Sequence, residues 1–186
     1  MSLPPEVRRA DKVMPEDRAR EVLAQGFCGR LATVGTDGWP YVVPLLYVWR
    51  DGELWLHNTS ARGHLRANVD SESRVCFEVD QPGAVFAYGR FECDTSVSYA
   101  SVIVFGHIRI IEGRDLKSRF FEDLMRKYSD ASLDRPKSFF PRLDEVTVYA
   151  ITAERITGKE TALPARSEQW PALDRTKSPN AKPPAS

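Results

Sequence analysis

The sequence predicts a mainly β, α+β protein: an antiparallel β-barrel with helices packed outside it. Short runs of β-branched and aromatic residues recur along the chain, separated by turn signals such as Asp37-Gly38 and Asp51-Gly52. A long run over 98–111 is rich in valine and isoleucine, as expected of a strand. Only two stretches have clear helical periodicity. Strands at this spacing with few helices between them are typical of an antiparallel barrel.

The first expected element is a helix over 14–26. Pro15 suits its first turn, acidic residues follow, and Gly26 closes it. Strands then dominate the sequence, with two tight turns between them. Three hairpin-linked strands in succession, which would form a meander, are expected over 27–35, 40–49 and 53–58.

The rest of the chain alternates between strands and helices. A short helix is expected over 63–70, then a strand over 73–80 and, after an irregular stretch, the strand over 98–111. Residues 115–128 form the second clear helix, and 145–158 the last strand. The apolar stripe of that helix consists of Leu116, Phe120 and Leu124, widened by Phe121, Met125 and Tyr128.

Length and composition support one domain with a tail. Of the 186 residues, 42% are hydrophobic, which is enough for a sizeable core. We place the barrel domain at 1–161 and a Pro-rich tail at 162–186, whose composition cannot order itself alone. Trp170 is out of place in such a tail, so we expect it to pack against a barrel surface.

Charge and hydropathy argue against two classes of partner. The 26 basic and 26 acidic residues cancel to a net charge of +0, so no nucleic-acid partner is expected. No run of 18 apolar residues occurs and the N-terminus has no signal pattern, so no membrane association is expected. The three cysteines share no close spacing. Cys28 and Cys76 lie in apolar, strand-like stretches, where we expect them to be small buried side chains. A cytoplasmic location fits this cysteine usage best.

Motifs of several enzyme classes are missing. There is no glycine-rich dinucleotide or P-loop motif and no G-x-S-x-G elbow. His57, His64 and His107 lack metal-ligand spacing, so no metal site is expected.

The stretch "WLHNTSARGHLRAN", over 55–68, contains the candidate binding residues. At this strand-to-helix corner Thr59 and Ser60 offer hydroxyl groups, Arg62 offers a planar guanidinium, and Gly63 allows close backbone approach. Together with the free N–H groups of a helix N-terminus, these groups suit a phosphomonoester. The alternative is an ordinary helix capped by Ser60 or Thr59, with Arg62 in solvent.

In order along the chain, "RRADK", "GRLATVGTDGWPYVVPLLYVW", "DGELWLHNTSARGHLRAN", "RVCFEVD" and "YASVIVFGHIRIIEG" resemble the pyridoxamine 5′-phosphate oxidase-like flavin-binding family. The resemblance runs from about residue 8 to 159 and is greater to the 5-nitroimidazole-resistance branch. It implies a split-barrel homodimer with FMN at the subunit interface and a small-molecule substrate. In such a dimer we expect Trp170 to pack close to the partner's flavin cleft, because a tail with no other large apolar group has little reason to keep an exposed tryptophan.

The resemblance also implies roles for individual residues. His57 matches a histidine near the flavin and is the candidate catalytic residue, as a proton donor. Ser101 matches the position of a flavin-contacting glutamine. The remaining cofactor-binding residues divide into the strand that lines the ring, Val43, Pro44 and Leu45, and the phosphate corner, His57, Asn58, Thr59, Ser60, Ala61, Arg62, Gly63 and His64.

This sequence departs from the family pattern at the corner. The branch usually reads H-x-A-x-x-G-H-K, whereas this chain has one extra residue between His57 and Gly63 and has Leu65 in place of the lysine. Arg62 is then the main phosphate cation. The Arg-x-His signature of pyridoxamine phosphate oxidases is absent from "SEQWPALDRTKS", so pyridoxamine phosphate is not the expected substrate.

The leading hypothesis is an FMN-dependent oxidoreductase that reduces a small compound, of the kind that nitroimidazole reductases act on, with NADH or NADPH as a possible electron donor. One alternative is a flavin-binding carrier or sensor without turnover. Another is a split barrel that binds haem or a deazaflavin in the same cleft.

Overall fold

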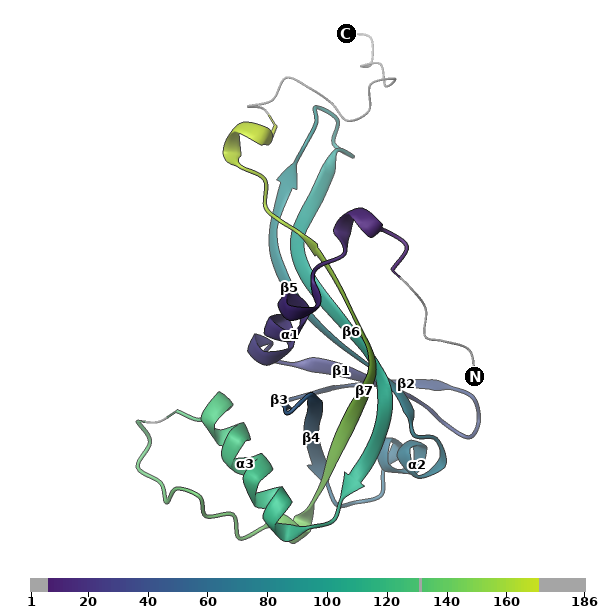
Figure 1. The fold of residues 1–186 in the computed structure, drawn as a ribbon, viewed down its shortest axis with the longest axis vertical. Helices are drawn as coiled ribbons and strands as arrows, with labels where there is room; N and C mark the ends of the chain where they lie inside the picture. Colours follow the sequence, from purple (N-terminus) through teal and green to yellow (C-terminus); the bar gives the residue numbers. More distant parts are fainter. Residues whose placement is uncertain (1–6, 131, 171–186) are drawn as a thin grey trace.

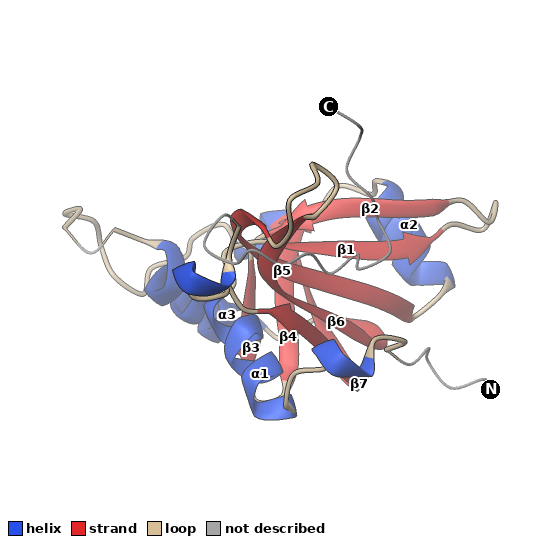
Figure 2. Cartoon of the chain, turned by 90° about the horizontal axis from the view of Figure 1, so that it is seen from above, coloured by secondary structure: helices blue, strands red, loops and turns tan. Residues whose placement is uncertain are grey.

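The computed structural model describes residues 7–130 and 132–170, which form one curved antiparallel sheet with helices at its margins (Figures 1 and 2). Its strands are β1 (Gly29–Val34), β2 (Pro40–Leu45), β3 (Tyr47–Arg50), β4 (Glu53–Thr59), β5 (Arg74–Ala87), β6 (Thr95–Ile111) and β7 (Val146–Thr161). The α-helices are α1 (Glu16–Gln25), α2 (His64–Ser71) and α3 (Arg114–Tyr128). Short 3₁₀ turns lie at Ala10–Lys12, Leu143–Glu145 and Arg166–Glu168. The predicted mainly β, α+β class is confirmed.

The strand order, β2-β1-β5-β6-β7-β4-β3, corrects the predicted meander. The expected strand over 40–49 breaks at Leu46 into β2 and β3, which lie at opposite ends of this order. Consecutive Cα atoms are only about 3.8 Å apart, so β2 and β3 are close where the chain passes from one to the other. The sheet therefore curls until its two ends meet at Leu46, which makes it a barrel.

Along most strands, alternate side chains face the barrel interior and its outer surface. Leu31 of β1, Phe77 of β5 and Val102 of β6 are fully buried and belong to the main core, which α1 closes with Val22 and Leu23. The Tyr47 hydroxyl donates a hydrogen bond of 2.5 Å to the Leu23 carbonyl oxygen, which ties α1 to β3. Burying these apolar side chains supplies most of the stability of the barrel.

A second, smaller core lies between α3 and the outer side of β3, β4 and β7. Phe120 and Leu124 of α3 pack there against Trp55 and Val148. The predicted apolar stripe on this helix is too wide, because Leu116 is 42% exposed and Met125 is 37% exposed. The helix therefore uses a narrower face than its sequence suggests.

Strands β5 and β6 are longer than predicted and extend beyond the barrel as an arm (Figure 1). The stretch 81–97, expected to be irregular, pairs as a hairpin with a register shift between Pro82 and Val85. Gly83 and Pro82 weaken the strand signal in the sequence. We define this arm as residues 82–99 together with the segment 162–170 that runs back to it.

The described part of the predicted tail is ordered on the arm. The Trp170 backbone N–H donates to the Ala87 carbonyl oxygen at 3.0 Å, and the side chain is 36% exposed. Trp170 therefore lies at the arm. Residues 171–186 of the predicted tail lie outside the described residues. Within the described part of the chain, no helix is long and apolar enough to cross a membrane.

A buried hydrogen bond holds α2 against β1, and its loss is expected to destabilise the fold. The Asn68 Nδ2 donates to the Thr33 Oγ1 at 2.9 Å, and both side chains are buried. Asn68→Ala leaves the Thr33 hydroxyl without this partner, so we expect a loss of about 1–3 kcal/mol in the free energy of unfolding, measured in urea. Ser71→Ala, on the exposed side of the same helix, is the control and is expected to cost less than about 0.5 kcal/mol. Equal losses in the two variants would contradict this role.

Candidate phosphate-binding corner and adjoining strand

The corner between β4 and α2 is an exposed loop that is anchored at one point. The Ser60 backbone N–H donates to the Glu145 carbonyl oxygen at 2.9 Å, which fixes the chain as it leaves β4. The side chains of Thr59, Ser60, Ala61, Arg62 and His64 are exposed, as is Gly63. These groups are therefore open to a ligand from solution.

The alternative interpretation of the corner, a helix capped by Ser60 or Thr59, is wrong. Helix α2 begins at His64, and its N-cap is Gly63, so neither Thr59 nor Ser60 caps it. No side chain accepts a hydrogen bond at this cap, which leaves the N–H groups of the first turn unsatisfied by capping. A Cβ atom at Gly63 would meet no atom within 4 Å, so the space in front of the helix is open. The helix N-terminus is thus available to an anion.

Arg62 is held at the corner by a carboxylate on α2. Its Nη2 lies 2.5 Å from Asp70 Oδ2, and Arg66 Nε lies 2.9 Å from Asp70 Oδ1. The two arginines lower the pKa of Asp70, with the hydrogen bond from Arg66 as the largest cause. Two guanidinium groups share one carboxylate, so the cluster keeps a net positive charge. Arg66 was not among the predicted site residues, although its spacing of four from Asp70 places the two on the same side of the helix, where they form an ion pair.

The corner lies beside β2, as the prediction of a common site requires. The rings of His64 and Tyr41 stack with a centroid distance of 5.6 Å. Val43 and Leu45 pack toward the main core, whereas Pro44 is exposed on the outer side. Since β2 is an end strand of the sheet, one row of its backbone N–H and C=O groups has no strand partner in the described chain. A ligand at β2 would meet backbone groups rather than the side chains of Val43 and Leu45.

His57 and Asn58 point to opposite sides of β4. Asn58 Oδ1 accepts a hydrogen bond of 3.1 Å from the Tyr149 hydroxyl. His57 lies against α3, with ring centroids 5.6 Å from Phe120 and 5.0 Å from Phe121. Its Nδ1 is buried without a hydrogen-bond partner among the described residues. The structure therefore places His57 in an aromatic environment and away from the exposed part of the corner.

Burial lowers the pKa of His57 below its ordinary value of 6.5. The unfolded chain binds a proton at this histidine near pH 6.5, whereas the folded chain binds it only at lower pH. The stability that His57 confers is therefore present above pH 6.5 and is lost as the pH falls through its folded pKa. We expect His57→Gln to lose less stability than the parent protein between pH 7 and pH 5, as measured by urea unfolding. An unchanged pH dependence in the variant would show that another group causes it.

Ser101 lies far from the corner within one chain. It faces outward on β6 and pairs in register with Lys159 of β7, whereas His57 pairs with Val148 of β7. Eleven residues of strand separate Val148 from Lys159, which corresponds to roughly 36 Å along β7 at ~3.3 Å per residue. One chain thus places Ser101 far from His57 along β7. Strand β2 is nearer to it, because the register pairs Pro44 with Arg30 and Glu78 with Ile103, so that only β1 and β5 lie between β2 and β6.

Within residues 7–130 and 132–170, no group of three or more histidine, cysteine, aspartate or glutamate residues is arranged to hold a metal ion. The three cysteines are free, and Cys28 and Cys76 are only partly buried, less than predicted.

A seven-stranded antiparallel sheet curls into a barrel whose end strands, β2 and β3, follow each other in the chain but are not paired. With helices outside and an open strand-to-helix corner, this arrangement defines a split-barrel protein. The chain belongs to the pyridoxamine 5′-phosphate oxidase family, whose model matches residues 15–160. The predicted family and fold are thereby confirmed. No curated protein sequence matches this chain.

Solved structures show the same fold at low sequence identity. A proposed 5-nitroimidazole antibiotic resistance protein from Bacteroides thetaiotaomicron has a TM-score of 0.67 at 21% identity, covering 80% of this chain and 86% of that one. The FAD and heme binding protein from Mycobacterium smegmatis has a TM-score of 0.67 at 20% identity, covering 84% and 78%. The flavocytochrome Anf3 from Azotobacter vinelandii has a TM-score of 0.69 at 16% identity, covering 97% and 91%.

Proposed function

We propose that this protein binds FMN and uses it to reduce a small organic compound with electrons from NADH or NADPH. The observation that carries the proposal is the uncapped N-terminus of α2 beside Arg62 and Arg66, in a chain of this family. Open backbone donors, exposed hydroxyl groups and a net positive charge are what a phosphomonoester requires. Similar folds in proteins whose names describe FAD binding, and a similar fold in a proposed nitroimidazole resistance protein, support a flavin and a nitroaromatic substrate.

In this proposal each part of the site has a separate task. Arg62, Thr59, Ser60 and the first turn of α2 hold the phosphate, and the free edge of β2 hydrogen-bonds the ring. When bound, FMN supplies the hydride- or electron-transfer chemistry, and the protein positions it and limits access of water. His57 is the proton donor in this proposal, provided that a group of the partner subunit or of the bound flavin forms a hydrogen bond with its buried Nδ1.

We further propose a homodimer, because one chain does not bring both His57 and Ser101 to one flavin. Ser101 is separated from the corner by the length of β7, so Ser101 of the partner subunit completes the site. The outer side of the sheet offers an apolar surface for such a contact, which we name the outer row. It consists of Val42, Ala32, Cys76 and Phe105, which are register partners across β2, β1, β5 and β6.

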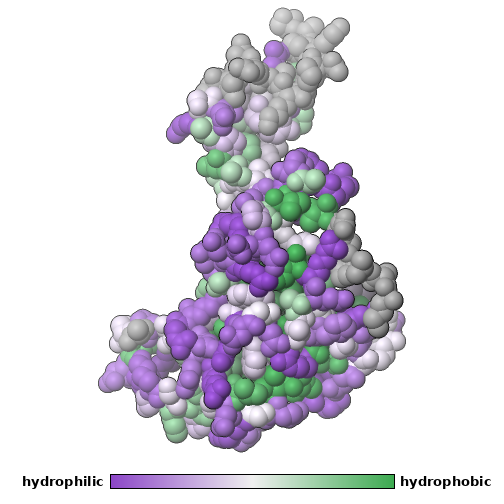
Figure 3. All heavy atoms as spheres, in the orientation of Figure 1, coloured by the Kyte–Doolittle hydropathy of each residue, from purple (hydrophilic) through white to green (hydrophobic). Residues whose placement is uncertain are grey.

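The apolar side chains of the outer row are partly exposed to solvent in the single chain. Val42 is 58% exposed and the neighbouring Val34 is 46% exposed, while Ala32, Cys76 and Phe105 are half-buried. Arg30, paired with Glu78 and Asp80, lies beside it and would form a polar rim. Hydrophobic atoms are also visible on the arm (Figure 3), where Val85 is 71% exposed. Neighbouring apolar side chains exposed on adjacent strands mark a surface for interaction with another subunit.

The experiment that tests the function is the absorbance spectrum of the purified protein, before and after addition of FMN. Bound FMN followed by anaerobic bleaching with NADH or NADPH, and reoxidation by a nitroaromatic compound, would support an enzyme. Bound FMN that neither nucleotide reduces would favour the carrier or sensor. A haem spectrum, or preference for a deazaflavin over FMN, would contradict the proposed cofactor.

A further inference from the structure

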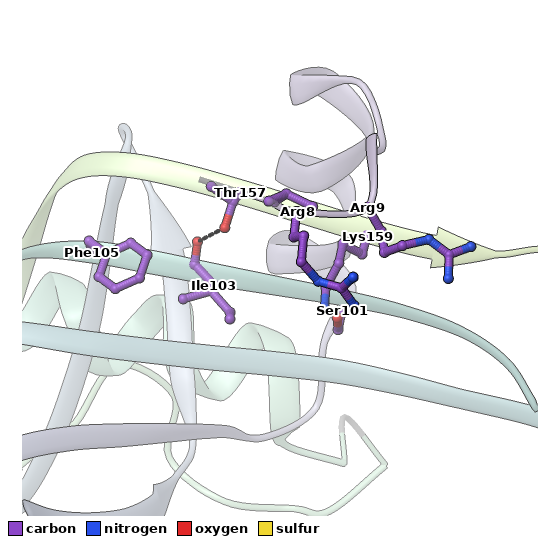
Figure 4. Close-up of a pocket in the computed structure, with 8 residues that line it drawn as sticks. Arg8, Arg9, Ser101, Ile103, Phe105, Thr157 and Lys159 are labelled. Carbon is purple, nitrogen blue, oxygen red and sulfur yellow. Dashed lines mark hydrogen bonds between the residues drawn. The ribbon is translucent and has the colours of Figure 1, made fainter. Parts of the chain in front are cut away.

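A second site lies on the outer side of β6 and β7, where residues 7–9 pass over the sheet (Figure 4). It is a hollow of about 210 Å³. The lining residues that matter here are Arg8, Ser101, Ile103, Phe105, Thr157 and Lys159. The chain is anchored to β7 a few residues further on, where the Met14 N–H donates to the Gly158 carbonyl oxygen at 3.1 Å and Val13 forms a β-bridge with Lys159. We name it the β6–β7 pocket.

The β6–β7 pocket contains two cations without counter-charges. Within the described residues, neither Arg8 nor Lys159 has an ion-pair or hydrogen-bond partner for its side chain. Figure 4 shows the Arg8 guanidinium turned toward Ser101 with Lys159 nearby, whereas Arg9 points away. An anion entering the pocket would therefore meet charged donors that no carboxylate of this chain occupies.

Neighbouring cations and acids are already paired with one another. Arg9 lies 2.6 Å from Asp11, and Arg18 lies 3.5 Å from Glu160. Asp80, the register partner of Ser101 on β5, is bound by Arg30. These neighbouring acids are therefore engaged by other arginines and do not neutralise Arg8 or Lys159.

The remaining lining residues indicate the size and polarity of the uncharged part of the ligand. Ile103 and Phe105 give one side an apolar surface. The Thr157 hydroxyl donates to the Ile103 carbonyl oxygen at 3.5 Å. The Ser101 hydroxyl has no hydrogen-bond partner among residues 7–130 and 132–170, so it can bond a ligand. A cavity of about 150 Å³ holds a benzene ring in another protein, so this hollow accepts one ring with its acidic group. It is too small for a dinucleotide.

From this charge, size and lining, we propose that the β6–β7 pocket binds a small organic carboxylate with one ring, held by Arg8 and Lys159. The binding itself does not depend on a flavin. That the bound carboxylate is also the substrate rests on the proposed function, in which Ser101 of the partner subunit contacts the flavin and so places this pocket beside it. The group reduced is then a nitro group on the ring: with two electrons from NADH or NADPH through FMN and two protons it becomes a nitroso group and water, and the carboxylate is unchanged.

The test is a titration of the purified, full-length protein with benzoate, followed by ligand-observed NMR, with benzyl alcohol as the uncharged analogue. We expect benzoate to bind and benzyl alcohol to bind at least tenfold more weakly. Arg8→Met and Lys159→Met are each expected to weaken benzoate about tenfold, which is the scale of one charge-assisted hydrogen bond. Arg119→Met, at an exposed arginine on α3 outside the pocket, is the matched control and should leave benzoate binding unchanged.

The other outcomes would overturn the inference. Equal binding of benzyl alcohol, or unchanged benzoate binding in both pocket variants, would show that the two cations are not a carboxylate site. Stronger binding of inorganic phosphate at the same residues, with loss of FMN in the Arg8 and Lys159 variants, would assign the pocket to a phosphate. Benzoate binding that depends on Arg8 and Lys159, in a protein that takes up no FMN, would support the pocket and refute the proposed function.

Discussion

Replacing Ala32 with arginine is expected to convert the proposed dimer into a monomer and to weaken FMN binding at least about a hundredfold. Ala32 lies in the middle of the outer row, between Val42 and Cys76. In the isolated chain a new arginine there can extend into water. In a dimer it would be a buried charge without a partner, which costs several kcal/mol. FMN binding should fall with dimerisation, because the partner supplies part of the site.

The control for this experiment is Ala24→Arg, which makes the same change at an exposed position of α1. Light scattering at micromolar concentration measures the mass, and fluorescence titration of FMN measures the affinity. The Ala24 variant should remain a dimer with unchanged affinity. A parent protein that is monomeric and binds FMN, or an Ala32 variant that remains dimeric, would contradict the proposed interface.

Arg62→Ala is expected to weaken FMN binding about ten- to a hundredfold, since a charge-assisted hydrogen bond contributes roughly 1.5–3 kcal/mol. The loss should be smaller for riboflavin, which has no phosphate. Arg74→Ala is a matched control, because Arg74 is also an exposed arginine in an ion pair, with Glu72, but lies outside the corner. Equal losses for FMN and riboflavin would mean that Arg62 shapes the fold or the ring pocket.

Asp70 provides a second and opposite test of the same corner. Its carboxylate binds Arg62 and Arg66 and would repel a phosphate placed nearby. Asp70→Asn should therefore strengthen FMN binding relative to the parent protein, while riboflavin changes little. Weaker FMN binding in this variant would show that the carboxylate positions Arg62 and that this role outweighs the repulsion.

Local sequence patterns were sufficient for much of the fold. Periodicity and turn residues correctly predict the positions of helices α1 and α3. They also predict where β1, β5, β6 and β7 lie within the barrel, apart from the arm. These signals are reliable because the alternation of buried and exposed positions is a property of each element by itself. The phosphate corner was predictable for the same reason, since Thr59 to His64 are contiguous in the chain.

Three features required the tertiary structure. The break at Leu46 has only Pro44 as a local signal, because the apolar run 40–49 continues through it, and the position of the break depends on how the sheet curls. The arm over 82–99 contains glycine and proline, and pairing with a neighbouring strand overrides their local preference. Leu116 and Met125 are apolar but exposed, because α3 meets the sheet along a narrow face.

For the site, the sequence by itself determined which groups stand together at the corner, because they are neighbours along the chain. Only the tertiary structure decided that His57 turns into the aromatic cluster of α3 and that Gly63, in place of Ser60 or Thr59, occupies the N-cap position of α2 and leaves the helix without a side-chain cap. It alone put Lys159 opposite Ser101, which no spacing in the sequence reveals. The physical reason is that register between distant strands depends on the summed packing of the whole sheet, whereas a corner depends on a few adjacent residues.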